Sequence, residues 1–243
     1  MFAGFPPDAF AFLRELAAEQ NKPWFEANRQ RYESGVRAPL GALVEALATR
    51  FAERDVPLQG DAKRSLFRLH RDVRFAKDRS PYKTHAGAVL FRQGGSKQPN
   101  GVLYVHIQPR ESFAAAAFYM PEPALLNALR AAIRDNPQTW RDVVRRLHAA
   151  GLTLSDGEPL TRMPRGYEHL ADSDVAPAIR MRSFMVRTKL TQALLGKSEA
   201  VAAIADFTEA AMPLLRWGWA AMDAPSEPES RIARFLPNPR SRA

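Results

Sequence analysis

Residues 86–120 read AGAVLFRQGGSKQPNGVLYVHIQPRESFAAAAFYM, and the fold class follows from this segment. It contains three short extended runs, residues 86–92, 101–108 and 112–120, and the first connection, residues 93–101, is rich in turn-forming Gly, Asn and Pro. In the middle run Leu103, Val105 and Ile107 alternate with Tyr104, His106 and Gln108, the period of a half-buried strand. Short strands at such close spacing predict an antiparallel meander.

Two further strands are predicted outside this stretch. Residues 179–186 (IRMRSFMV) form a candidate fifth strand that places Arg180 and Arg182 on one face. Residues 65–75 also alternate, which predicts a strand before the first one. Its apolar face is Phe67, Leu69, Val73 and Phe75, interrupted by Arg71, and its polar face is Arg68, His70, Asp72 and Arg74.

Helical patterns flank the strands on both sides. Before them, helices are expected to begin near Asp8, Pro23 and Pro39; after them, helices are expected over residues 123–134, 137–151 and 198–222, with a kink at Pro213. Helices, then strands, then helices predict an α+β fold in which an antiparallel meander of four to five strands is packed by N- and C-terminal helices. We expect a single domain over residues 1–223 and a disordered Pro- and Arg-rich tail over 224–243.

Positive charge is concentrated just before the second strand. The chain carries a net charge of +9, and residues 63–83 hold eight cationic residues against two carboxylates, which is six of the nine net charges. Abundant cations favour anionic partners such as phosphorylated ligands or nucleic acid. We therefore expect an anionic small-molecule ligand here, with nucleic acid as a second possibility.

The candidate site combines the polar faces of two predicted strands. Facing side chains on adjacent strands lie about 5 Å apart, so His70 and Asp72 are expected near His106, where the three would transfer protons as catalytic residues. Guanidinium forks match phosphate or carboxylate oxygens in pairs. Arg71 interrupts an apolar series and is expected to have a carboxylate or carbonyl partner. The predicted ligand- or anion-binding residues are Arg68, Arg71, Arg74, Lys77, Asp78, Tyr82, Lys83 and Tyr104.

Several classes of protein are disfavoured. No apolar run approaches the roughly 20 residues of a membrane helix, and the N-terminus lacks the features of a signal peptide. The absence of cysteine fits a reducing, cytoplasmic location and removes thiolate metal sites. The five histidines show no metal-ligand spacing, and no G-x-S-x-G hydrolase motif is present, so we expect no metal and assign no cofactor.

A series of motifs resembles a known bacterial family. NKPWFEANRQRYE (residues 21–33), RDVRFAKDRSPYKTHAG (71–87), LYVHIQP (103–109), YMPE (119–122) and MPRGY (163–167) occur in this order. They resemble the family called domain of unknown function 2461, over nearly the whole chain. The resemblance implies a single α+β domain and no particular reaction. It also draws attention to the matching positions in residues 71–83 and to the face formed by Trp24, Phe25, Asn28 and Tyr32, which would cover the same cleft.

Three functions remain open from the sequence. The first is binding or processing of a small ligand that carries phosphate or carboxylate. The second is nucleic-acid binding through the same basic segment, with Phe75, Tyr82 and Tyr104 stacking on bases. The third is a structural or regulatory module without catalysis, so whether the protein is an enzyme is left undecided.

Overall fold

The computed structural model describes residues 1–72, 74, 78–95, 100–155 and 157–224. A five-stranded sheet has the order β1-β2-β3-β4-β5, and every neighbouring pair is antiparallel. The predicted meander within an α+β fold is therefore confirmed. The strands are β1 (Leu58–Gln59), β2 (Ala86–Arg92), β3 (Val102–Ile107), β4 (Phe113–Phe118) and β5 (Phe184–Lys189).

Helices precede and follow the meander, as the sequence predicts. The N-terminal group is α1 (Pro7–Ala18), α2 (Lys22–Arg31), a π-helical turn η1 (Tyr32–Arg37) and α3 (Ala38–Glu53). The second group is α4 (Pro123–Asp135), α5 (Pro137–Ala149), a 3₁₀ turn η2 (Glu168–Leu170), α6 (Ala176–Arg180), α7 (Gln192–Leu195) and α8 (Ala200–Asp223). No helix in the described residues is both long and apolar enough to cross a lipid bilayer.

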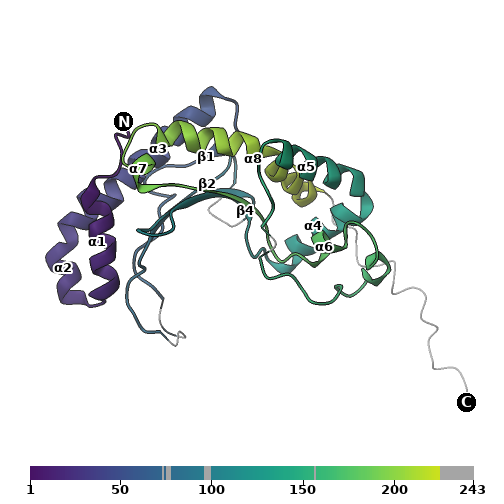
Figure 1. Cartoon of the computed structure of the whole chain (residues 1–243), viewed down its shortest axis with the longest axis horizontal. Coiled ribbons are helices and arrows are strands. Elements are labelled where there is room, and N and C mark those ends of the chain that lie inside the picture. The colour runs from purple at the N-terminus through teal and green to yellow at the C-terminus, as the bar shows by residue number, and fades with distance from the viewer. Residues whose placement is uncertain (73, 75–77, 96–99, 156, 225–243) are drawn as a thin grey trace, which may run out of the picture.

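The two faces of the sheet differ in their cover. Leu103, Val105 and Ile107 belong to the main hydrophobic core, together with the inner faces of α3 and α8. Tyr104 and His106 point to the opposite face and are only half-buried. Figure 1 shows the sheet as an arch, with α3 and α8 above it and the second face on the inside of the curve. The alternation of apolar and polar side chains along β3 therefore corresponds to a core face and an accessible face of the sheet.

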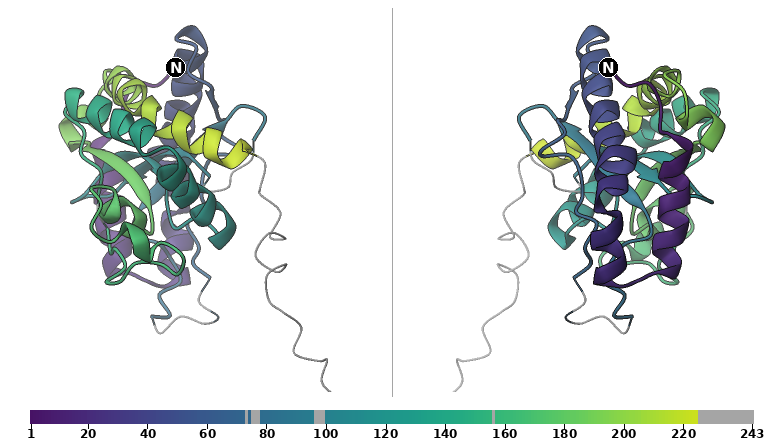
Figure 2. Two further views of the ribbon diagram at one scale, coloured as in Figure 1. Left: turned by 90° about the vertical axis from the view of Figure 1, so that its right-hand side faces the viewer. Right: turned by 90° about the vertical axis from the view of Figure 1, so that its left-hand side faces the viewer.

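A continuous helical run contains an irregular turn. α2 passes through η1 into α3 with right-handed helical backbone angles at both junctions, as the right-hand view of Figure 2 shows. The sequence predicts a separate helix beginning at Pro39, which instead lies inside the run. A proline lacks the N–H of the helix ladder and its ring clashes with the carbonyl four residues earlier, here that of Gly35. The π turn just before Pro39 changes the hydrogen-bond pattern and lets the helix continue.

The end of α8 is tightly packed on the β2–β3 hairpin. The ring of fully buried Phe118 lies between Gly101 and Gly218, where an added Cβ would come within 2.5 Å and 2.3 Å of it. The indole N–H of Trp219 is shared between the carbonyl oxygens of Asn100 and Gly101, at 3.2 and 3.1 Å. These contacts fix the C-terminal turns of α8 against the sheet.

Two predicted strands differ from the observed ones. Residues 65–75 do not form a strand of the sheet: in the described part, Phe67 donates its N–H to Gly87 and Leu66 bridges Ala88, after which the chain leaves the edge of β2. The fifth strand begins at Phe184, because Pro177 favours the first turn of a helix and residues 176–180 form α6. Arg180 and Arg182 therefore share no strand face.

Candidate functional site

The segment after residue 68 forms a small hairpin rather than a sheet strand. Arg71 donates its N–H to the carbonyl of Pro81 and Lys83 donates to Leu69, each at 2.9 Å, so residues 69–71 run beside 81–83. Tyr82 is buried, stacks on Phe25 at 4.6 Å between ring centroids, and donates its N–H to the side chain of Gln20. Tyr82 is thus a core anchor of the hairpin.

The charged residues of this hairpin pair with one another. The Arg71 guanidinium binds the Asp78 carboxylate, and Arg74 binds Asp72 through two hydrogen bonds of 3.0 and 2.7 Å. Hydrogen bonds from Ser80, and then from Arg71, hold the pKa of Asp78 well below its usual range. The expected carboxylate partner of Arg71 is present, and the predicted residue Lys77 lies outside the described residues. These side chains form two separate ion pairs near the surface.

His70 lies away from His106. Its ring contacts Phe25 and Tyr82 edge-on, at 5.8 and 5.0 Å, on the side of the hairpin that faces α2. The structure therefore does not assemble His70, Asp72 and His106 as the sequence predicts, because residues 68–72 leave the sheet before their polar face can meet β3. The predicted approach of Phe25 and Tyr32 to this segment is observed, since both line a hollow with His70.

A different set of residues meets on the accessible face of the sheet. Lys83 and His85 precede Gly87 at alternate positions, and Gly87 is directly opposite His106 in the register of β2 and β3. The rings of His85 and His106 lie 4.3 Å apart, and His106 stacks on Phe113 at 4.8 Å. We call Lys83, His85, Tyr104 and His106 the sheet-face cluster.

A hydrogen-bond chain runs along β3. Tyr104 Oη lies 3.0 Å from His106 Nδ1, and His106 Nε2 lies 2.9 Å from Gln108 Oε1. Because an amide oxygen only accepts, Nε2 carries the proton and donates, and Nδ1 accepts from the Tyr104 hydroxyl. The chain fixes the ring of His106 and its tautomer.

Gly87 makes room for this arrangement. A Cβ at this position would lie 2.7 Å from Tyr104 Oη and 3.0 Å from the tyrosine ring. Any side chain here would therefore displace the phenol from His106. The glycine in a buried strand is explained by close approach of Tyr104 rather than by backbone conformation.

Protonation states follow from partial burial. Burial, then His106 and Lys83, lower the pKa of His85 to about 4, and burial likewise lowers the pKa of His106. Burial raises the pKa of Tyr104 to about 12. Near neutral pH both imidazoles and the phenol are uncharged.

Lys83 is the cation of the cluster. Its ammonium lies 5.4 Å from the centre of the Phe67 ring, and no described carboxylate pairs with it. Burial, and then the nearby Arg68, lower the pKa of Lys83. A partly dehydrated cation without a counter-ion is a favourable position for an anion.

The predicted site residues therefore divide into three groups. Lys83, Tyr104 and His106 meet on the sheet face, with Arg68 close to Lys83. Arg71, Asp72, Arg74 and Asp78 form the two ion pairs, and His70 and Tyr82 face α2. His85 is the residue that the sequence analysis missed. The available signal was its position two residues after Lys83 and two before Gly87, which places all three on one side of an extended chain.

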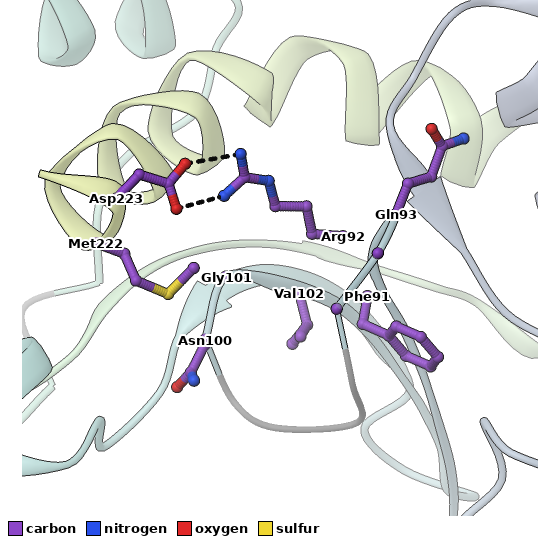
Figure 3. A pocket seen from close by; sticks show the side chains of 10 residues that line it. Phe91, Arg92, Gln93, Asn100, Gly101, Val102, Met222 and Asp223 are labelled. Atoms are coloured by element: carbon purple, nitrogen blue, oxygen red, sulfur yellow. Dashed lines mark hydrogen bonds and ion pairs between the residues drawn. The ribbon is translucent and has the colours of Figure 1, made fainter.

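Another hollow, larger than the one that His70 lines, lies between the β2–β3 hairpin and the end of α8 (Figure 3). Its volume is about 390 Å³, and Arg92 crosses it to bind Asp223 with two contacts of 2.8 and 2.9 Å. These two charges satisfy each other, so the hollow offers less to a ligand than the sheet face does. Across the described residues, no three His, Asp or Glu side chains are grouped closely enough to hold a metal ion.

Comparisons with known proteins identify a family. A family model described as "Conserved hypothetical protein (DUF2461)" matches residues 8–217, most of the chain. No curated protein and no solved structure matches the chain.

Proposed function

Because the chain belongs to the DUF2461 family of conserved hypothetical proteins, whose description assigns no reaction, we propose a function from the sheet-face cluster: the protein binds a small ligand that carries a phosphate or carboxylate group. The observation that carries this proposal is the convergence of Lys83, His85, Tyr104 and His106, all half-buried, on the second face of the sheet. The cluster also unites two of the sequence motifs, PYKTHAG and LYVHIQP.

The cluster offers a charge and several directed hydrogen bonds to an anion. Lys83 would supply the positive charge. His85 makes no hydrogen bond with any described residue, so its ring nitrogens are available to a ligand. Charge-assisted hydrogen bonds of this kind are about twice as strong as neutral ones.

Binding is better supported than acid–base catalysis. An efficient general base at neutral pH has a pKa near 7, whereas the pKa of His85 is about 4. A bound anion next to His85 would raise that pKa, so binding at mildly acidic pH should take up protons. The proposal includes a cytoplasmic location, which the lack of cysteine favours.

Inorganic phosphate provides a direct test. We expect phosphate, titrated against chloride at constant ionic strength, to shift the imidazole NMR signals of His85 and His106. Lys83→Ala should weaken this binding roughly 10- to 150-fold, the effect of losing one charge-assisted contact of about 1.5–3 kcal/mol. The matched control is Lys197→Ala, an exposed lysine between α7 and α8. Equal binding by both variants would refute the proposal.

Nucleic acid is the competing outcome of this test. Fluorescence anisotropy with a short single-stranded DNA should show weak binding, because the cations of residues 71–79 largely pair with neighbouring carboxylates in the described part of the hairpin. Tight binding that falls steeply with added salt, together with no response to phosphate, would favour the nucleic-acid function instead. If neither phosphate nor single-stranded DNA binds, the third function, a structural module, would be favoured.

A further inference from the structure

The hollow that Phe25, Tyr32 and His70 line is bordered by residues 66–70, which connect it to the sheet-face cluster through the contact of Phe67 with Lys83. It is about 260 Å³ in volume and runs between the π-helical turn and the segment 62–70. We call it the π-turn groove and define it by Tyr32, Glu33, Arg37, Lys63, Arg68 and His70. Single-turn π segments inside α-helices are often found at functional sites.

Positive charge dominates the walls of this groove. Arg29, Arg37, Lys63 and Arg68 line it, against the single carboxylate of Glu33. Arg37 is held by Glu33 at 2.9 Å, and Arg29 by Glu26 outside the groove at 2.6 Å. The side chains of Lys63 and Arg68 form no ion pair within the described part of the chain. Like charges gathered in a hollow concentrate the electric field and attract anions.

The floor of the groove is aromatic and offers a hydroxyl group. Phe25 and Tyr32 pack together there, with ring centres 5.8 Å apart. Tyr32 is 9% exposed, and its hydroxyl makes no hydrogen bond with a described residue. No fully buried polar side-chain atom lacks a partner in the described residues, so this hydroxyl keeps some contact with solvent and can donate to a ligand.

The groove continues along α3 past small side chains. A neighbouring hollow shares Glu33, Arg37 and Lys63 with it and is lined further along by Gly41 and Ala42. The cationic end therefore opens into a space that an uncharged part of a ligand can occupy. Arginine forks bind phosphate oxygens in pairs, and carboxylates that hold Arg29 and Arg37 limit the motion of their guanidinium groups.

We infer that the π-turn groove is a second binding site, separate from the sheet face, for a small organic phosphate: its phosphate lies among Arg37, Lys63 and Arg68, and its organic part lies over Tyr32 or along α3. Phosphate is favoured over carboxylate because several cations line one hollow and a phosphate dianion carries twice the charge. This inference does not depend on the function proposed for the sheet-face cluster.

Phenyl phosphate is a suitable probe, with the arginine Nε–H NMR signals as the readout. We expect it to shift the signals of Arg37 and Arg68 in the full-length protein. Lys63→Ala should weaken this effect about tenfold, the loss of one charge-assisted contact. The matched control is Arg64→Ala, which removes the neighbouring cation, one that pairs with Asp61 outside the groove.

Two further measurements distinguish the π-turn groove from the sheet-face cluster and phosphate from carboxylate ligands. Lys83→Ala should leave the response of Arg37 intact, while it weakens phosphate binding at the sheet face. Benzoate should bind the groove more weakly than phenyl phosphate does. The inference is overturned if Arg37 and Arg68 do not respond, if Lys63→Ala and Arg64→Ala behave alike, or if benzoate binds equally well.

Discussion

The pH dependence of unfolding tests the sheet-face cluster through the substitution His85→Gln. In the folded protein the pKa of His85 is about 4, whereas an unfolded histidine has a pKa of about 6.5. Between these two pH values, His85 is therefore protonated in the unfolded chain but not in the folded chain. It follows that the free energy of unfolding is largest above pH 6.5, falls as the pH drops below that value, and loses the full contribution of His85 only below pH 4.

The size of the effect follows from these two values. One pKa unit corresponds to about 1.4 kcal/mol, so lowering the pH from 7 to 5 should cost about 2 kcal/mol through His85 alone. The ring is only half-buried, and solvent screening reduces the expected loss to about 1–2 kcal/mol. His106 adds to the loss in the same direction, because burial lowers its pKa as well.

Urea unfolding followed by tryptophan fluorescence at pH 7, 6 and 5 measures this loss. Three of the four tryptophans are buried, so unfolding changes the signal. We expect His85→Gln to lose about 1–2 kcal/mol less stability than the wild type over this range. His148→Gln, at an exposed position near the end of α5, should behave like the wild type. Parallel losses in the wild type and His85→Gln would refute the reasoning about burial.

Three further substitutions test the packing. Gly218→Ala should destabilise the protein by about 1–3 kcal/mol in urea unfolding, although alanine favours a helix, because its Cβ would overlap the ring of Phe118; a gain in stability would contradict this packing. Arg130→Met should lower the free energy of unfolding by about 2–3 kcal/mol in the same assay, because the buried guanidinium donates hydrogen bonds to two backbone carbonyls before β5. An unchanged urea midpoint would show that water replaces these hydrogen bonds. Asp72→Asn should leave the melting temperature unchanged, since its pair with Arg74 is exposed, and a clear loss would assign that pair a structural role.

The central strands could be predicted from the sequence because the signals for them, alternating side chains and turn-forming residues, lie within each segment. β2, β3 and β4 appear within about two residues of the predicted runs, and the alternation of Leu103 with Tyr104 assigns their faces correctly. Residues 65–75 have the same alternation, but their described part does not continue as a strand. Their backbone bonds to β2 end near Phe67, and the chain then pairs with residues 81–83. Periodicity describes side chains and does not reveal which backbone partner is available.

The two candidate sites differ in how far the sequence could predict them. Tyr104 and His106 were predicted because they share one strand face. His85 follows the PYK bend, and its approach to His106 depends on the register between β2 and β3. The π-turn groove joins Arg37 to Lys63 and Arg68 through helix packing, which no local pattern encodes. Sequence reasoning thus identified the basic segment but placed it on a strand face beside β3, whereas the chain leaves the sheet near Phe67.

The ring of Phe118 between Gly101 and Gly218 has a consequence for folding. It joins three parts of the chain that are more than 100 residues apart at their extremes, so the native packing of the last turns of α8 requires both the β2–β3 hairpin and β4. Contacts of such long sequence separation slow folding. The amide hydrogens of Trp217, Gly218 and Trp219 should therefore exchange with solvent in one cooperative step with those of the hairpin, rather than by fraying from the end of the helix.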